Sequence, residues 1–97
     1  MGLAEDILRE LENIKKGELR TYKEIALKFN TSPRAVARII SKNKNPIEVP
    51  CHRVVKSNGE IGGYTYKGKF CPEMKEVLLK KEGHKIVNGR ILKKRIN

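Results

Sequence analysis

The sequence predicts a mainly α-helical domain with a winged helix-turn-helix-like fold and a small β wing. Its 97 residues are enough for one domain. Two short amphipathic segments, each with an N-terminal capping signal, follow one another between residues 21 and 41. A valine-rich segment with an Asn-Gly turn comes after them and has the pattern of a small hairpin.

Leucine and isoleucine recur at helical spacing near the start of the chain and predict a helix over residues 3–16. Gly17 follows two lysines and acts as a C-terminal stop signal. The residues that form the apolar face are Leu3, Ile7, Leu8, Leu11 and Ile14.

The next two helices are marked by their N-terminal caps. Thr21 and Glu24 have the spacing of a capping box, and Ser32 precedes a proline that suits the first helical position. The break between the helices is expected at Asn30–Thr31. The apolar faces consist of Ile25, Ala26 and Phe29 in the first helix, and of Ala35, Val36, Ile39 and Ile40 in the second. Two short helices joined by about three residues indicate a helix-turn-helix.

The wing is expected after a proline-bracketed segment, residues 46–50. Val54–Val55, the tight turn at Asn58–Gly59 and Ile61 indicate a small hairpin. Gly62, Gly63 and Gly68 follow in a stretch without periodicity.

A fourth helix is expected from Pro72 to Lys81, with Gly83 as its stop signal. Its inward-facing residues are predicted to be Met74, Val77 and Leu78. The residues after His84 carry five cations and no acid, and we expect them to form a solvated surface that contacts phosphates.

The charge of the chain indicates a polyanionic partner. Lys and Arg number 22 against 11 Asp and Glu, which gives a net charge of +11. Such an excess favours nucleic acid, so the fold is expected to be a DNA-binding domain. Two cysteines are too few for a disulfide framework, and no signal peptide or membrane-spanning segment is visible. We therefore expect a soluble, cytoplasmic protein.

Cys51 is the candidate nucleophile because it lies between Pro50 and His52, with Arg53 next. A nearby histidine or arginine lowers the pKa of a thiol and favours the reactive thiolate. Neighbouring side chains point apart, so a bridging water is the favoured proton route to His52, which itself needs an acid to orient it. A buried, inert cysteine remains the alternative. No metal site is expected, because the cysteines and histidines lack paired ligand spacing.

The run Pro50–Cys51–His52–Arg53–Val54 resembles the P-C-H-R-V active-site motif of the O6-alkylguanine-DNA alkyltransferases, which repair DNA by methylating themselves. The helix-turn-helix, the motif and the glycines after it come in the order found in that family. The resemblance covers residues 4–87. It implies a single alkyltransferase domain over residues 1–97, without the family's usual N-terminal domain.

The resemblance also implies how DNA is held. Arg34 matches the arginine that takes the place of a flipped nucleotide in the duplex. Tyr22 matches the tyrosine that crowds the neighbouring phosphate and donates a proton to the leaving guanine. Ala35 and Arg38, on the same helix, are expected to contact DNA. This helix offers no Asn or Gln before Asn43 for reading bases, so binding is expected to be independent of sequence.

Around the cysteine, the resemblance implies a braced pocket. Asn43 matches the asparagine that braces the cysteine turn, and Tyr64 matches the residue that contacts the guanine ring. Thr65 and Arg53 are placed with this group. Glu82 matches the glutamate that partners the active-site histidine. Glu48 and Tyr66–Lys67 depart from the family pattern, so the range of accepted alkyl groups is left open.

The expected function is repair of double-stranded DNA by transfer of an alkyl group, such as methyl, from O6 of a flipped guanine to Cys51. The transfer is irreversible, consumes the protein and uses no cofactor, and the protein is expected to be a monomer. Two alternatives remain: an alkyltransferase-like protein that binds the lesion without reacting, and a helix-turn-helix transcription regulator. The regulator explains the charge but not the Pro50-to-Val54 segment.

Overall fold

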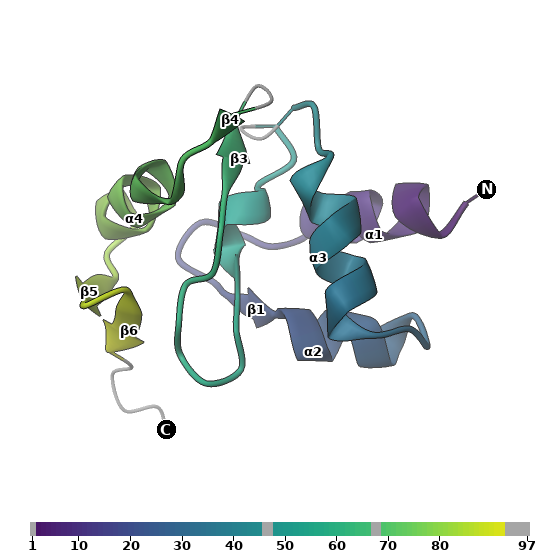
Figure 1. The fold of residues 1–97 in the computed structure, drawn as a ribbon, viewed down its shortest axis with the longest axis horizontal. Helices are drawn as coiled ribbons and strands as arrows, with labels where there is room; N and C mark the ends of the chain where they lie inside the picture. Colours follow the sequence, from purple (N-terminus) through teal and green to yellow (C-terminus); the bar gives the residue numbers. More distant parts are fainter. Residues whose placement is uncertain (1, 46–47, 67–68, 93–97) are drawn as a thin grey trace.

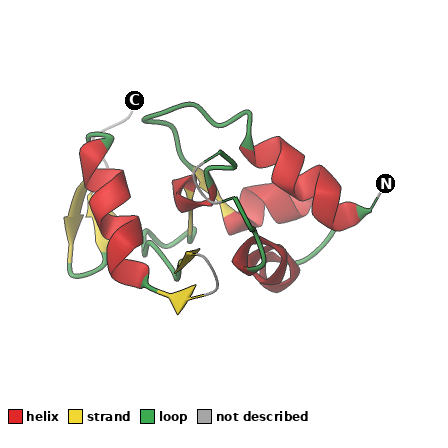
Figure 2. Cartoon of the chain, turned by 90° about the horizontal axis from the view of Figure 1, so that it is seen from above, coloured by secondary structure: helices red, strands yellow, loops and turns green. Residues whose placement is uncertain are grey.

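A computed structural model of the chain describes residues 2–45, 48–66 and 69–92. Over these residues it contains four α-helices, one short 3₁₀ helix and three two-stranded sheets. Helices α1, α2 and α3 lie at one end of the molecule, and α4 with strands β5 and β6 lies at the other (Figures 1 and 2). The mainly α-helical class is therefore confirmed. Segment 46–47, Lys67 and the basic tail from residue 93 lie outside the described residues.

Helix α1 spans Leu3–Leu11, and the predicted extension to residue 16 is wrong. After Leu11 the backbone continues in bonds of the i→i+3 type, such as Ile14 N–H to the Leu11 carbonyl at 3.1 Å, which end the α-helix. Gly17 then adopts a φ of +88°, a conformation that suits glycine. Ile14 is still buried, but in a turn rather than on a helix face.

Helices α2 (Tyr22–Lys28) and α3 (Pro33–Ser41) confirm the predicted pair. Thr21 and Glu24 form both bonds of the capping box, at 3.0 and 2.8 Å. The Ser32 hydroxyl accepts the Ala35 N–H at 3.1 Å. Asn30 ends the first helix with a φ of +55°. The two helices pack against each other, and α1 packs against α3.

The predicted wing is only partly correct. The turn at Asn58–Gly59 is present, since the Gly59 N–H donates to the Lys56 carbonyl at 3.0 Å and the Lys56 N–H to the Glu60 carbonyl at 2.8 Å. Strand β2 (Val54–Val55), however, pairs in parallel with β1 (Arg20–Thr21) rather than with a returning strand. Residue Glu60 bridges to Arg90 instead. Both valines of β2 are buried, so pairing with β1 places their apolar surface in the core.

A second hairpin, β3 (Thr65–Tyr66) with β4 (Lys69–Phe70), leads into α4 (Pro72–Lys81). The predicted inward face of α4 is partly wrong: Val77 is 52% exposed, whereas Lys75 and Leu79 are fully buried. The buried face of α4 is rotated relative to the predicted one, since positions 75 and 79, one turn apart, face the rest of the protein. Met74 and Leu78 pack at the edge of the core.

The residues after His84 form a hairpin that the sequence analysis missed. Strands β5 (Lys85–Val87) and β6 (Arg90–Leu92) are antiparallel, with Ile86 and Ile91 buried between the hairpin and α4. The residues Ile86 and Ile91 are thus not solvated, whereas the described cations of this segment, Lys85 and Arg90, are exposed as expected. In the part of the chain that the structure describes, no helix has the length and apolarity to cross a membrane.

Candidate active site

Cys51 begins the 3₁₀ helix η1 (Cys51–Arg53) and is 2% exposed. It lines a cavity of about 230 Å³ that lies between α3, Tyr22 and the β3–β4 hairpin. The other lining residues are Tyr22, Ala37, Ile40, Ser41, Gly63, Tyr64, Thr65 and Phe70. The predicted pocket residues Tyr64 and Thr65 are thus brought to the cysteine, although Tyr64 is also part of the hydrophobic core.

Asn43 braces the segment before the cysteine. Its Nδ2 donates to the Val49 carbonyl at 2.9 Å, and its Oδ1 accepts the Asn45 N–H at 3.0 Å. The same Val49 carbonyl accepts the Cys51 N–H at 2.7 Å. The buried amide therefore fixes the turn from which the thiol projects.

Glu82 joins the two residues that follow the cysteine. Its carboxylate lies 2.9 Å from Nε2 of His52 and accepts from Nη2 of Arg53 at 2.8 Å. Arg53 also donates to the Ile14 carbonyl at 2.7 Å, which ties this group to the turn after α1. Burial by itself raises the pKa of Glu82, but the bonds from Arg53 and His52 outweigh it and lower the pKa to about 2. The carboxylate is ionised at neutral pH.

His52 is buried, and its two ring nitrogens have different surroundings. Its pKa is lowered chiefly by burial, against the opposing effect of the bond to Glu82. When neutral, with Nε2–H donating to Glu82, the ring keeps Nδ1 as an acceptor. Within the described residues this buried nitrogen has no hydrogen-bond partner. Burial also raises the pKa of Cys51, opposed by a bond from Asn43 and by the charge of Lys75. The thiol therefore requires a base for ionisation.

Lys75 was not found by the sequence analysis, although it is 0% exposed. Its Nζ donates to the carbonyls of Val54 at 2.6 Å and Gly63 at 3.3 Å, and to the Tyr22 hydroxyl at 3.3 Å. Burial lowers the pKa of Lys75 to about 7, against the opposing charge of Cys51. The one signal in the sequence is its spacing of four from Leu79, which places both on one helix face.

Tyr22, the first residue of α2, separates the cysteine cavity from a larger one. Burial, and next the proximity of Cys51, raise the pKa of Tyr22 to about 12. Because its oxygen accepts from Lys75, its own proton is free to point toward a ligand. Phe70, a second residue that the sequence analysis missed, lines the cysteine cavity yet is 72% exposed.

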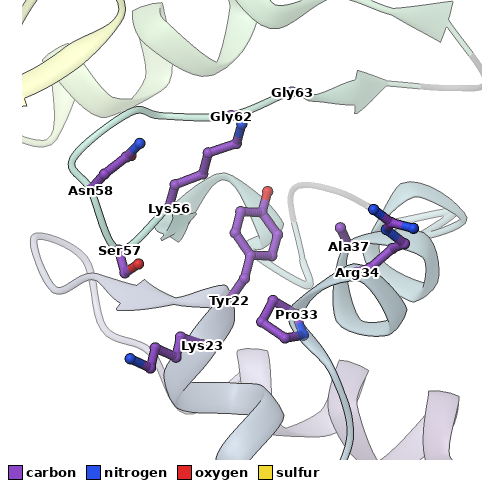
Figure 3. Close-up of a pocket in the computed structure, with 10 residues that line it drawn as sticks. All are labelled: Tyr22, Lys23, Pro33, Arg34, Ala37, Lys56, Ser57, Asn58, Gly62 and Gly63. Atoms are coloured by element: carbon purple, nitrogen blue, oxygen red, sulfur yellow. The ribbon is translucent and has the colours of Figure 1, made fainter.

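The larger cavity, about 450 Å³, is lined in part by Arg34 from the first turn of α3 (Figure 3). Arg34 and Arg38 are exposed, and Ala35 is half-buried. Of the predicted DNA-contacting residues, Arg34 and Tyr22 share this cavity, whereas Ala35 and Arg38 do not line it.

Comparison with known proteins identifies the family of the chain. The family described as 6-O-methylguanine DNA methyltransferase, DNA binding domain, matches residues 3–84. The chain is 50% identical over 74 residues to the methylated-DNA–protein-cysteine methyltransferase of Methanocaldococcus vulcanius, which is 73% of this chain and 45% of that protein. The chain therefore belongs to the 6-O-methylguanine DNA methyltransferase family, through its DNA-binding domain.

Solved structures give the same result. The O6-methylguanine-DNA methyltransferase of Pyrococcus kodakaraensis superposes with a TM-score of 0.72 at 40% identity, over 86% of this chain and 47% of that one. Atl1 of S. pombe, solved with damaged DNA containing O6-carboxymethylguanine, gives 0.72 at 25% identity, over 87% and 78%. The chain spans about half the length of the curated methyltransferases that it matches.

Proposed function

We propose that the chain repairs double-stranded DNA by transferring an alkyl group, in the simplest case methyl, from O6 of a flipped-out guanine to Cys51. The observation that carries the proposal is the cavity lined by the buried thiol of Cys51. His52 follows Cys51 in the chain, and its buried Nδ1 has no hydrogen-bond partner among the residues that the structure describes. Its volume, about 230 Å³, is below the roughly 300–1,000 Å³ of sites for drug-sized ligands, and suits one base with a small alkyl group.

DNA binding is proposed for the α2–α3 pair, acting as a helix-turn-helix. Taking a base out of the duplex costs a few kcal/mol. Arg34, exposed in the first turn of α3, is positioned to fill the resulting gap, and Tyr22 lies between it and the thiol cavity. We propose that the domain acts on DNA in the cytoplasm.

The chemistry is an in-line displacement. The Cys51 proton passes to His52 through a bridging water, while Glu82 orients the imidazole and stabilises its positive charge. The thiolate attacks the alkyl carbon, the S–C bond forms, and the C–O6 bond breaks with its electron pair remaining on guanine. Tyr22 donates a proton to the leaving base and regains one from solvent, while the protonated His52 releases its proton to solvent. The products are a thioether on Cys51 and unmodified guanine. A thioether is not cleaved under mild conditions, so each chain reacts once.

The alternative is a protein that binds the lesion without reacting. Two observations favour this alternative. The raised pKa of Cys51 disfavours the reactive thiolate, and the chain shares its fold with Atl1, which was solved in complex with DNA containing O6-carboxymethylguanine. The number of lesions repaired separates the two functions. With a tenfold excess of duplex containing O6-methylguanine, we expect one guanine restored per chain and no further reaction. Tight binding with no restored guanine would establish the binder, and several turnovers per chain would contradict both functions.

A further inference from the structure

The cavity that Cys51 lines has an exposed rim. The rim consists of the lining residues that are themselves exposed, which are Ala37, Ser41, Gly63 and Phe70. Three of these residues carry a small side chain or none, whereas Phe70 carries a phenyl ring. In the described part of the chain, Phe70 is therefore the one large side chain at the rim of this cavity.

Two neighbours hold the ring of Phe70 at the rim. A Cβ at Gly63 would lie 2.8 Å from Cε1 and 3.3 Å from Cζ of Phe70, so the ring packs closely on the bare backbone of this glycine. Phe70 also lies opposite Thr65 in the β3–β4 pair, and directly opposite residues project to the same face of a hairpin. Thr65 itself lines the cavity. Phe70 thus stays at the rim although 72% of it is exposed.

The inner part of the cavity is formed by buried residues, among them Cys51, Ile40 and Tyr64. Because Cys51 is only 2% exposed, an alkyl group reaches its Sγ through the cavity. The carbon atom that is transferred must lie against Sγ. Close-packed interiors do not yield to extra volume, so any further atoms of the alkyl group extend back toward the rim. There they meet the ring of Phe70.

We propose that Phe70 is a specificity-determining residue, which favours small alkyl groups such as methyl and disfavours groups that carry a ring, such as benzyl. The inference rests on the proposed function, because it concerns the substrate range of the same site. The cavity of about 230 Å³ is small, and its one bulky exposed wall is the ring of Phe70. Phe70→Ala removes a phenyl ring, which is the group that benzyl adds to methyl, so this variant provides the missing room.

The test compares the binding of two duplexes that differ only in the group on O6 of one guanine, methyl or benzyl. Each variant also carries Cys51→Ala, which leaves the alkyl group on the base. With Phe70 present, we expect the methylated duplex to bind at least about tenfold more tightly, since a single methylene without room in an apolar pocket already discriminates about 10–200-fold. Phe70→Ala should reduce this preference at least about tenfold, and Phe70→Leu should give an intermediate value.

Leu27→Ala is the matched control, because Leu27 is equally exposed but lies on α2, away from the cavity. It should leave the preference for methyl unchanged. In Phe70→Ala the benzylated duplex itself should bind more tightly than in the parent. An unchanged preference, or one that falls only because the methylated duplex binds more weakly, would overturn the role of Phe70. The unfolding midpoint of each variant checks that it is folded.

Gly63→Ala tests the position of the ring. The added Cβ cannot lie 2.8 Å from Cε1, so the ring must leave its place, and we expect the preference for methyl to fall by less than in Phe70→Ala. In a chain that already carries Phe70→Ala, the same change should have no further effect, because no ring is left to displace. Equal effects in both chains would show that Gly63 acts without Phe70 and would overturn its part in the proposal.

Transfer by chains that retain Cys51 separates this inference from the proposed function. A benzyl carbon is as open to displacement as methyl, so a slower reaction reports on fit. We expect wild type to restore O6-methylguanine at least about tenfold faster than O6-benzylguanine, and Phe70→Ala to narrow this difference. If wild type restores methylated guanine and Phe70→Ala gains no reaction with benzyl, only the role of Phe70 is wrong. If binding preferences change as expected but no guanine is restored, Phe70 limits the size of the group and alkyl transfer is wrong.

Discussion

The two cysteines of the chain lie in regions of opposite character. Cys51 is buried at the start of η1, against an anchored histidine, an asparagine brace and a buried lysine. Cys71 is half-buried at the N-cap of α4, and its Sγ lies 3.6 Å from the Lys69 carbonyl. The comparison shows that the accessibility of a thiol and its reactivity toward one specific substrate are separate properties. Burial opposes ionisation of Cys51, but the same burial supplies the cavity and the base that a specific transfer needs.

The largest effect on the reactivity of Cys51 is expected from Glu82→Gln. The variant weakens the anchor of His52 and Arg53, and we expect alkyl transfer to slow by about a hundredfold, the lower end of the contribution of a general base. Single-turnover kinetics with methylated duplex measure it. Glu76→Gln, half-buried on helix α4, which Glu82 caps, is the matched control and should transfer at the wild-type rate; its carboxylate pairs with Lys80 at 3.0 Å.

Glu82 also predicts a dependence of stability on pH. Its pKa is lowered to about 2 in the folded protein from an ordinary value of 4.5. The carboxylate therefore stabilises the fold fully above pH 4.5, and this contribution is lost as pH falls from 4.5 toward 2. Chemical denaturation of wild type and Glu82→Gln should give free energies of unfolding that converge in acid. A constant difference from pH 7 to pH 2.5 would contradict the ionic role.

Lys75→Met tests the second support of the thiol region. Loss of the ammonium group removes the bond to Tyr22 and the charge near Cys51, so we expect about tenfold slower transfer.

The pKa of Lys75 is lowered from 10.5 to about 7, so the unfolded chain binds more protons between these values. The contribution of Lys75 to the free energy of unfolding thus rises with pH across this window. The wild type should gain stability relative to Lys75→Met from pH 7 to pH 10; parallel curves would contradict a shifted lysine.

With a small reagent, Cys71 should react faster than Cys51, the reverse of the order expected for alkyl transfer from DNA. Iodoacetamide requires only access and ionisation, so we expect it to modify Cys71 several times faster than Cys51 in the native protein. Mass spectrometry of the two cysteine peptides over time gives both rates. Faster modification of Cys51 would show that its thiol is activated even when no DNA is bound. It would also show that burial does not control the reactivity of this thiol.

The smallest expected effect is at Phe70. Its ring lines the cavity of Cys51 but is 72% exposed, which leaves a face for a flipped base to stack on. Phe70→Ala should weaken binding of methylated relative to undamaged duplex by about fivefold, about 1 kcal/mol. Leu27→Ala, equally exposed on α2, is the control for loss of an apolar side chain. Equal effects of the two variants would contradict a role of Phe70 in binding the methylated base.

Local signals predicted the half of the fold that contains α2 and α3, because Thr21, Glu24, Ser32 and Pro33 act on their immediate neighbours. The motif around Cys51 drew attention to a thiol that lines a cavity, and the contact between His52 and Glu82 was expected from the resemblance. Lys75 and the β5–β6 hairpin escaped prediction for a physical reason. The buried ammonium group of Lys75 donates hydrogen bonds to carbonyls that are distant in the sequence, and the hairpin pairs with a turn that lies about 30 residues earlier. Neither partner is visible in a local window.

The most direct test of the account is the location of the methyl group. The protein is incubated with excess duplex containing O6-methylguanine, digested, and its two cysteine peptides are weighed. The account predicts one added methyl group on the Cys51 peptide, none on the Cys71 peptide, the same result in Cys71→Ser, and no methylation in Cys51→Ala, although this variant still binds the duplex. Methylation of Cys71, or two unchanged peptides in a chain that binds the lesion, would contradict it.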